Sequence, residues 1–530
     1  MKSSRSTLKI DPEHNNKVLS SVSSTGDVKL DAASWEKSQK EFNVKTLLGP
    51  YLPSELPEDA RLLPRRPIWE CHGGNTEASC RNIDDGLMGG QNGAVGLSAV
   101  HRPCTVDTLV AGGRRVSERF PRDKLSGYTS DFGGAYRQVP GRPSQAKKFG
   151  VTMWDAIRCR VVIGLAAAQL FGSRSAPLNF SRYPDWCSYC CSVLFLSILW
   201  QCIDDLISME RSSTINSSRE SWLTFADCCG WDIPLLKSPP PAQLFRALGV
   251  FIDLSPLPTS YATVKVCELR ISGILLALRG ITQSQRLPPG LASSLVGKLQ
   301  FTTVAFAGHF GKAMLRSIRR RSYEHRSNMN PQLLATLDWW LRNLNNAPSR
   351  PIPWMISGRK LVVTYSDGEG ADAGVGVAIW CDELRLPQAG RMMVPECVRR
   401  MWSSTRGSPD DPLYDIQNIE GIGPLIALYT WPEVLRGSLW LHFIDNNGAL
   451  ACLVKGGSRV MGTDTIIGMT WNKVAQLEVV PWFDRVDTKS NPVDGLSRGD
   501  LSGNWELVNL VFPIARLKAE IRRSRRFSPL

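Results

Sequence analysis

The sequence has 530 residues, of which 43% are hydrophobic and 21% are charged, so it is long and apolar enough for several domains with cores of their own. This length excludes a small module held together by disulfides. The 14 cysteines show no regular spacing and are expected to be reduced intracellular thiols. Lysine and arginine exceed aspartate and glutamate by 14, which favours a polyanionic partner such as nucleic acid.

The N-terminal segment carries no targeting signal that we can identify. It reads MKSSRSTLKIDPEHNNK and lacks the apolar run of a signal peptide. The longest apolar run, about 189 to 203, is too short to cross a bilayer, so we expect an intracellular protein, cytoplasmic or nuclear, with no membrane partner. Residues 1 to 45 are polar with little periodicity and predict a flexible tail.

Two adjacent carboxylates, Asp204 and Asp205, lie within the segment QCIDDLIS. The preceding run, CSVLFLSILW at 191 to 200, predicts a buried strand, and the apolar pattern resumes after the acids. Carboxylates ~4 Å apart repel by about 4 kcal/mol at an effective dielectric near 20, so a hairpin that binds a cation is one interpretation. An ordinary turn rich in aspartate is the other.

Three further segments carry candidate site residues. YTSDFGGAYRQVP places Asp131 at a predicted strand end, followed by two glycines and a helical turn that begins near Tyr136. LFGSRSAPLNFSR pairs a Gly-Ser turn, which begins at Gly172, with Arg174, and its backbone could line a template or an incoming base, or simply join a loop to a helix. In CRNIDDGLMGGQN, Arg81 could hold a phosphate or be a surface charge.

These segments, in this order, resemble the palm of a reverse transcriptase. The resemblance implies that Asp131, Asp204 and Asp205 hold two Mg²⁺ or Mn²⁺ ions at the polymerase site. It also implies a steric gate against the ribose 2′-hydroxyl at Tyr136. Arg81 would bind the triphosphate, and Phe171 and Gly172 would contact substrate. The segment CGWDIPLLKSPPPAQLFRALGVFID extends the resemblance and implies that Lys237 protonates the departing pyrophosphate, although a solvated lysine is equally consistent with the pattern.

The chain departs from the family pattern at two positions. Cys202 stands where the family usually has a tyrosine, and Ser79 stands where a lysine is often found. The elements GP, LPRR, RNIDDG, LGV and GKLQF, with NPVDGLSRG near the end, look most like those of DIRS-like and dinoflagellate retrotransposons.

From about residue 259 to 358 the apolar residues recur at spacings of three and four residues, which predicts helices. A helical segment suits a thumb or connection region. The segment also carries a basic cluster, which is expected to contact phosphates or to form a solvated helix face. Its members are Lys312, Arg316, Arg319, Arg320, Arg321 and Arg326.

A second catalytic domain is predicted to begin near residue 360, where KLVVTYSDGEGADAGVGVAIW places Asp367 at a strand end facing solvent. Glu420, on a predicted helix, Asp445, at another strand end, and Asp494 follow it. This order of acids resembles ribonuclease H and implies that the four hold two divalent ions. The family often has a mobile histidine before the last acid, which VDTKSNPVD lacks, and His442 on the preceding strand is not expected to replace it.

The resemblance implies an α+β right-hand polymerase, with fingers, palm and thumb, followed by an α/β ribonuclease H-like domain. The expected segments are a tail at 1 to 45, fingers and palm at 46 to 258, a helical thumb or connection at 259 to 358, the ribonuclease domain at 359 to 500 and a basic tail at 501 to 530.

The implied activity is RNA-directed DNA polymerisation together with degradation of RNA in RNA–DNA hybrids. Its partners would be an RNA template, a DNA primer, deoxynucleoside triphosphates and other retroelement proteins. Two alternatives stay open. One is a catalytically weakened nucleic-acid-binding protein derived from such an element, and the other is an RNA-directed RNA polymerase.

Overall fold

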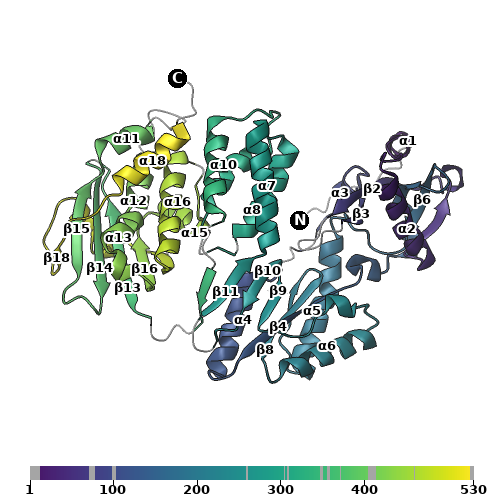
Figure 1. Cartoon of the computed structure of the whole chain (residues 1–530), viewed down its shortest axis with the longest axis horizontal. Coiled ribbons are helices and arrows are strands. Elements are labelled where there is room, and N and C mark those ends of the chain that lie inside the picture. The colour runs from purple at the N-terminus through teal and green to yellow at the C-terminus, as the bar shows by residue number, and fades with distance from the viewer. Residues whose placement is uncertain are drawn as a thin grey trace. The chain divides into compact units, whose positions relative to one another are not determined.

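The computed structural model describes residues 12–70, 78–97, 99, 103–257, 261–303, 305–306, 309–345, 350–354, 359–370, 372–403, 413–458 and 460–525. The chain is a mixed α/β protein that divides into two compact units, residues 1–258 and residues 259–530 (Figure 1). Cys71 and His72, which could suggest a zinc site or a loop by sequence, lie outside the described residues.

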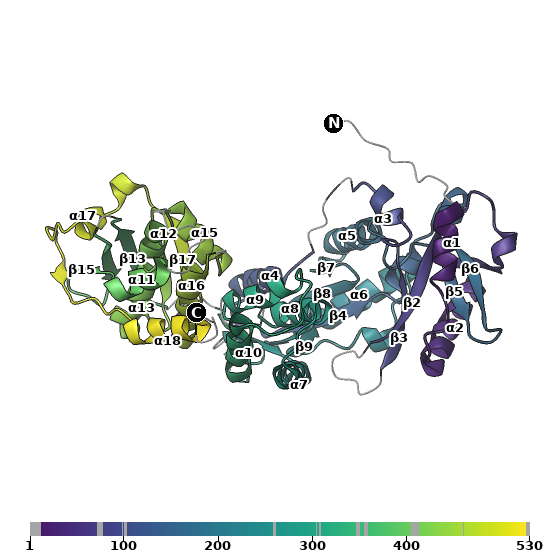
Figure 2. The ribbon, with the colours of Figure 1, turned by 90° about the horizontal axis from the view of Figure 1, so that it is seen from above.

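The first unit contains a five-stranded sheet in the order β1-β6-β5-β2-β3. Its strands are β1 (Leu47–Tyr51), β2 (Leu62–Glu70), β3 (Ser79–Asp84), β5 (Gly150–Asp155) and β6 (Arg160–Ala166). Two helices precede it in sequence, α1 (Pro12–Ser20) and α2 (Val28–Asn43), and α2 runs along the sheet (Figure 2). The side chain of Asp27 caps α2, and Trp35 is buried at 3% exposure. The prediction of a flexible tail is therefore wrong for these helices, because their apolar positions, although sparse, face the sheet.

A second, three-stranded sheet has the order β4-β8-β7. The strands are β4 (Leu125–Asp131), β7 (Trp200–Cys202) and β8 (Asp205–Arg211), and the long helices of this part are α4 (Val106–Arg119), α5 (Ala176–Leu194) and α6 (Ile215–Cys228). Phe132, Phe180 and Trp222 pack edge to face in the core between them. The predicted strand at 191 to 200 is wrong, because α5 continues to Leu194, where Val193 and Leu194 are 57% and 63% exposed.

Shorter elements complete the first unit. They are η1 (Pro53–Glu55), α3 (Gln91–Ala94), η2 (Ala135–Gln138), η3 (Pro143–Lys148), η4 (Leu235–Lys237), β9 (Leu244–Ala247) and β10 (Val250–Asp253). β9 and β10 form an antiparallel hairpin. Its two-residue turn has positive φ at both positions, Leu248 and Gly249, the backbone twist that a tight hairpin requires.

The second unit starts with strand β11 (Tyr261–Val266) and a group of helices. These are α7 (Glu268–Ser284), α8 (Pro289–Thr303), η5 (Ala313–Leu315), α9 (Arg316–Arg321) and α10 (Pro331–Asn343), and strand β12 (Arg350–Pro353) follows and pairs with β11. Trp340 is fully buried and packs edge to face on Trp339, so both indoles belong to the core of this group.

The rest of the second unit is a six-stranded sheet in the order β17-β16-β13-β14-β15-β18. Its strands are β13 (Leu361–Gly368), β14 (Gly374–Cys381), β15 (Gln388–Met393), β16 (Leu439–Ile444), β17 (Val480–Arg485) and β18 (Glu506–Leu507). β16 runs parallel to β13 and β17, whereas β14 is antiparallel to both of its neighbours.

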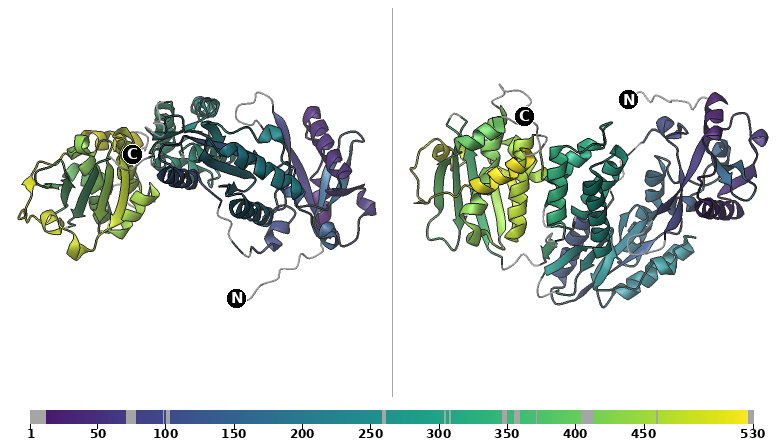
Figure 3. Two further views of the ribbon diagram at one scale, coloured as in Figure 1. Left: turned by 90° about the horizontal axis from the view of Figure 1, so that it is seen from below. Right: turned by 45° about the horizontal axis from the view of Figure 1, so that its top comes forward.

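Helices cover this sheet, as Figure 3 shows. The helices in this part are α11 (Glu396–Ser403), α12 (Leu413–Gly421), α13 (Gly423–Thr430), α14 (Pro432–Leu435), α15 (Asn447–Lys455), α16 (Met461–Gln476), η6 (Thr488–Ser490), α17 (Asp494–Ser497) and α18 (Ile514–Arg525). Of these, α12, α13, α15 and α17 contact the strands of the sheet. Successive residues of β14 point to opposite faces, so Val377 joins the larger core cluster and Ala378 the smaller one beside α17.

The predicted basic tail at 501 to 530 is also corrected in part. Residues 506 and 507 pair with β15, and α18 buries Leu517 completely in the core of the sheet domain. Among the described residues, no helix is both long and apolar enough to cross a membrane.

Candidate active sites

The first candidate site lies at the end of the three-stranded sheet. β4 and β8 are antiparallel in a register that places Asp131 directly opposite Asp205. β7 and β8 form a tight hairpin in which Cys202 pairs with Asp205, so Ile203 and Asp204 make the turn. Ile203 adopts a positive φ of 58° there. The turn thus brings the three acids, hereafter the hairpin carboxylates, to one end of the sheet.

Two of the hairpin carboxylates, Asp204 and Asp205, have raised pKa values. Burial, with the charges of Asp204 and Asp131, raises the pKa of Asp205 to about 7. Burial and the charge of Asp131 also raise the pKa of Asp204. A bound cation would reverse both effects.

A lysine on the neighbouring 3₁₀ turn neutralises one of the three acids. Lys237, at the end of η4, donates a hydrogen bond from Nζ to Asp131 Oδ2 at 2.6 Å. Both residues were predicted from sequence as site residues, and the structure places them in direct contact.

Arg81, Tyr136 and Phe171 gather beside the hairpin carboxylates. The Arg81 guanidinium lies 4.4 Å from the centre of the Phe171 ring, and the Tyr136 and Phe171 ring centres are 5.7 Å apart. Arg81 also donates from Nη1 to both carboxylate oxygens of Glu70, at 2.7 and 2.8 Å. Burial and the charge of Asp204 raise the pKa of Tyr136 to about 12, so the phenol is neutral.

Gly172 has a structural reason to be glycine. Its φ is +107°, and a Cβ there would lie 2.2 Å from the carbonyl oxygen of Asp84. Asn92 holds the same turn, because its Nδ2 donates to Gly172 O at 2.9 Å and its Oδ1 accepts from Arg174 N at 2.7 Å. Sequence reasoning missed Asn92, which lies 80 residues away along the chain.

Sequence reasoning also missed a buried ionic network centred on Asp84. The two oxygens of Asp84 accept from Arg65 Nε at 2.8 Å and from Arg137 Nη2 at 2.9 Å. Glu41 closes the network with the same two arginines, at 2.7 and 2.9 Å. The network ties α2, β2 and β3 to the η2 turn that carries Tyr136. The only sequence feature that indicates this network is the run RNIDDG. Nothing in that run shows which of its two aspartates is buried.

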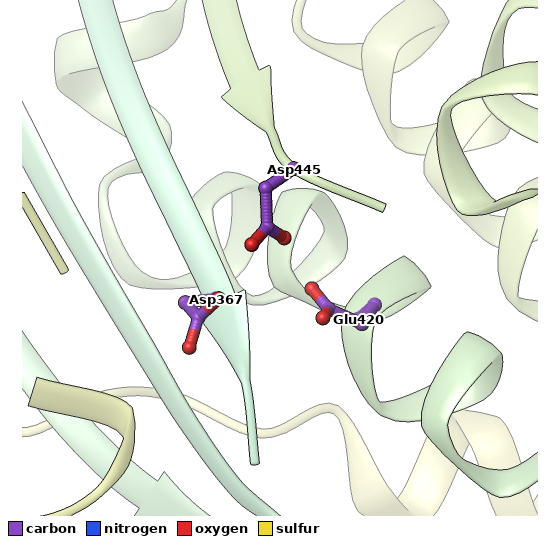
Figure 4. Close-up of side chains that lie close together, drawn as sticks. All are labelled: Asp367, Glu420 and Asp445. Carbon is purple, nitrogen blue, oxygen red and sulfur yellow. The ribbon is translucent and has the colours of Figure 1, made fainter. Parts of the chain in front are cut away.

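The second candidate site lies at an end of the six-stranded sheet. Asp367 is near the end of β13, Asp445 directly follows β16, and Glu420 lies on α12. Because β13 and β16 are parallel neighbours, their ends meet at the same edge. Figure 4 shows the three side chains turned toward one another, and their ligand oxygens lie within 4.8 Å of one another. Among the described residues, no other group of three acids, histidines or cysteines converges this closely.

These residues, hereafter the acidic triad, sit in a poorly hydrated environment. Asp367 is only 4% exposed, so the predicted solvent-facing position is wrong: α12 and α17 cover this strand end. Burial and the neighbouring acids raise the pKa of Glu420 to about 9. Burial, with the charges of Asp445 and Asp494, raises the pKa of Asp367 to about 6, although a hydrogen bond from Ser497 opposes that shift.

The triad has unsatisfied oxygens suited to a cation. Glu420 Oε2 and Asp445 Oδ1 are buried and accept no hydrogen bond from the described residues. Buried carboxylate oxygens without donors are costly unless a cation binds them, and an all-oxygen set suits hard ions such as Mg²⁺ or Mn²⁺. The residues present therefore fit a divalent metal.

Hydroxyl groups donate hydrogen bonds to two of the three triad acids. Ser497 Oγ donates to Asp367 Oδ2 at 2.5 Å, and Thr488 Oγ1 donates to Asp445 Oδ2 at 2.9 Å. The fourth predicted acid, Asp494, lies outside the triad and accepts from Arg498 Nη2 at 2.8 Å. Its charge nevertheless contributes to the raised pKa values of Asp367 and Glu420.

His442 is a core residue. It is fully buried between the hydroxyls of Thr364 and Ser366, at 2.7 and 3.0 Å from its two ring nitrogens. Burial lowers its pKa to about 3, so the ring is neutral, and both of its nitrogens are engaged by these hydroxyls.

No protein-family profile matches this chain, and no curated protein matches it. The chain is similar to solved structures of a foamy viral protease-reverse transcriptase. A dRH form in complex with double-stranded DNA shares 13% identity with a TM-score of 0.46, over 86% of this chain and 70% of that one. The protein in complex with double-stranded DNA shares 13% identity with a TM-score of 0.44, over 86% and 83%. Its complex with an RNA/DNA hybrid shares 11% identity with a TM-score of 0.44, over 91% of this chain and 55% of that one.

Proposed function

We propose that this chain is an RNA-directed DNA polymerase of a retroelement, with a ribonuclease activity against the RNA strand of RNA–DNA hybrids. The observation that carries the proposal is the acidic triad, with its unsatisfied buried oxygens, following the hairpin carboxylates on the same chain. Residues 46 to 258 would form fingers and palm, residues 259 to 358 a thumb or connection, and residues 359 to 500 a ribonuclease H-like domain. Placement among DIRS-like or dinoflagellate elements belongs to the same proposal.

At the polymerase site, each group has a role that its position allows. Asp131 and Asp205, on facing strands, and Asp204, on the turn, would hold two Mg²⁺ ions. Lys237, in contact with Asp131, is placed to donate a proton to departing pyrophosphate once metal binding frees it.

The groups beside the carboxylates would select and hold the nucleotide. Arg81 would exchange Glu70 for the triphosphate, since a guanidinium offers paired donors to either anion. Tyr136, a neutral phenol packed on Phe171 and Phe180, would stand beside the sugar and exclude a 2′-hydroxyl.

At the ribonuclease site, the acidic triad would hold the metal, with Asp494 approaching when substrate draws Arg498 away. Ser497 and Thr488 would keep two of the carboxylates in position. When bound at either site, divalent ions would activate the attacking oxygen and stabilise charge on the leaving oxygen.

Primer extension tests the polymerase. The assay uses an RNA template, a DNA primer, deoxynucleotides and Mg²⁺ or Mn²⁺, and compares the natural chain with an Asp204→Asn, Asp205→Asn double variant. We expect extension by the natural chain and none by the variant. Ribonucleotides in place of deoxynucleotides should not be incorporated, and their efficient use would favour an RNA polymerase.

Hybrid cleavage tests the ribonuclease. The natural chain should degrade the RNA strand of a labelled hybrid in Mg²⁺, and Asp445→Asn should abolish this cleavage while leaving primer extension intact. The double variant at the hairpin should show the reverse pattern. Each variant therefore serves as the folding control for the other.

One observation favours a second candidate, a nucleic-acid-binding protein without polymerase turnover. Lys237 forms an ion pair with Asp131. The oxygens of the three hairpin carboxylates do not all lie within 4.8 Å of one another, whereas those of the acidic triad do. Cys202 adds to this case, since it replaces the expected tyrosine beside the acids. If the natural chain binds primer and template but does not extend the primer, this candidate takes first place.

A further inference from the structure

A cavity dominated by arginine lies in the second unit, among the helices α7 to α10. Its volume is about 560 Å³, and it is lined by the α7–α8 connection, by α9 with the loop that follows, and by the start of α10. The charged side chains in its lining are Arg286, Arg320, Arg321, Arg326 and Glu324. Four guanidinium groups and one carboxylate give it a formal charge of +3. None of the acids of the two candidate active sites lines it.

Backbone hydrogen bonds build the frame of this cavity. Leu287 N donates to Ser327 O at 2.7 Å, and Met329 N donates to Gln285 O at 3.3 Å, so the loop after α9 is joined to the α7–α8 connection. Asn330 then caps α10, because its Oδ1 accepts from Leu333 N at 2.9 Å. The walls are thus held by regular structure on both sides of the loop.

Arg321 is the buried member of the lining. It is 2% exposed and donates from Nε to Glu324 Oε2 at 3.1 Å and from Nη1 to Arg326 O at 3.1 Å. Glu324 also pairs with Arg320, at 3.3 Å. One carboxylate is therefore shared by two guanidinium groups, and the positive charge of the cavity is not neutralised from within.

Three of the four arginines are exposed, and Arg286 and Arg326 are the two of these that are not paired with Glu324. Neither forms an ion pair or side-chain hydrogen bond with any residue in the described part of the chain. At the start of α10, a helix of 13 residues, Pro331 has no N–H and the N–H groups of Leu333 and Leu334 donate to Asn330. The N–H of Gln332 is the one that remains in this first turn, and Gln332 lines the cavity. Planar paired donors and a helix N-terminus are both suited to a tetrahedral oxyanion.

We propose that this cavity is a phosphate-binding site, in which Arg286 and Arg326 contact the ligand and Arg321 supplies a fixed buried charge. The ligand class is a phosphate group, either free, as in pyrophosphate, or in a nucleic-acid backbone. The nucleic-acid source rests on the proposed function, whereas binding of free pyrophosphate does not. None of the candidate metal ligands lines this cavity, so we expect phosphate binding here to need no divalent metal.

Calorimetric titration of the full chain with pyrophosphate in the presence of EDTA tests the free ligand. EDTA removes metal-dependent binding at the acidic sites. The pocket variant, Arg286→Gln with Arg326→Gln, is compared with a matched control, Arg385→Gln with Arg516→Gln, which removes two exposed arginines elsewhere in the second unit. We expect the pocket variant to bind pyrophosphate about tenfold or more weakly and the control to bind as the natural chain does.

Titration with an RNA–DNA hybrid, also in EDTA and at several salt concentrations, tests the backbone phosphate. Loss of two phosphate contacts should reduce the slope of log affinity against log salt by about one to two in the pocket variant. An effect on the hybrid alone identifies a backbone phosphate as the ligand, and an effect on pyrophosphate alone identifies a free one. If the pocket variant and the control behave alike with both ligands, the proposal is overturned. Primer extension is measured in a separate assay. If the natural chain does not extend a primer, the proposed polymerase activity is refuted, but the result of the pyrophosphate titration still stands.

Discussion

Asp131 and Asp205 face each other as a cross-strand pair on β4 and β8, with Asp204 on the adjoining turn. Like charges at directly opposed positions destabilise a sheet. Burial, followed by the charges of Asp204 and Asp131, raises the pKa of Asp205 to about 7. A site that keeps such repulsion between carboxylates is suited to binding a cation.

Asp205→Asn should lower the rate of primer extension by about 100-fold or more. The same substitution should stabilise the metal-free protein. The folded-state pKa of Asp205 lies above its ordinary value of 3.8, so its ionised form destabilises the fold as pH rises toward 7. Thermal denaturation in EDTA at pH 8 should show a Tm a few degrees higher, by about 2 to 4 °C, in the variant. An unchanged or lower Tm would contradict the repulsion argument.

Glu420→Gln should abolish hybrid cleavage and remove a pH dependence of stability. The folded pKa of Asp367 is raised from 3.8 to about 6 and that of Glu420 from 4.5 to about 9, so the metal-free fold loses stability as pH rises from about 4 to 9. Magnesium should restore stability at pH 8 to 9 and should release protons on binding, since the ligands must ionise. Calorimetry in buffers of different ionisation enthalpy measures this release. A proton release equal in natural chain and variant would rule out Glu420 as a ligand that ionises on binding.

Gly172→Ala should destabilise the first unit and impair primer extension while sparing hybrid cleavage. Gly172 has positive φ, and a Cβ there would collide with the backbone of Asp84. The matched control is Gly230→Ala, where φ is +76° but no atom lies within 4 Å of the added Cβ. We expect about 1 kcal/mol for the control, from backbone strain alone, and about 2 to 4 kcal/mol for Gly172→Ala. Equal losses in urea denaturation would show that the close approach to Asp84 contributes nothing.

His442→Gln should lower stability at neutral pH and reduce its sensitivity to acid. The folded pKa of about 3 lies below the ordinary 6.5, so the neutral ring stabilises the fold above pH 6.5. That contribution is lost as pH falls from about 6.5 toward 3. Loss of the hydrogen bonds to Thr364 and Ser366 should cost about 1 to 3 kcal/mol. Urea denaturation at pH 7.5 and pH 5 measures both effects, and an equal acid sensitivity in the two proteins would assign it to other groups.

Local pattern was enough to predict the elements that carry the candidate acids. Asp131 and Asp367 end strands, Asp445 follows one, and Glu420 lies on a helix, because each is flanked by a short run with clear strand or helix periodicity. The hairpin turn at Asp204 was also readable, since a polar pair interrupted an apolar run. Periodicity failed at 191 to 194, where apolar side chains cover the exposed end of α5 and do not mark a buried strand.

The sequence by itself determined which residues are candidates for a site, and the tertiary structure decided which of them lie together. Asp367, Glu420 and Asp445 converge only because β13 and β16 are parallel neighbours and α12 packs over their ends, whereas Asp494 stays with Arg498. The buried network at Asp84, the reason for glycine at position 172 and the arginine-lined cavity likewise join segments far apart in sequence. Burial and mutual charge set the pKa values of these groups, and both depend on neighbours that no local pattern can name.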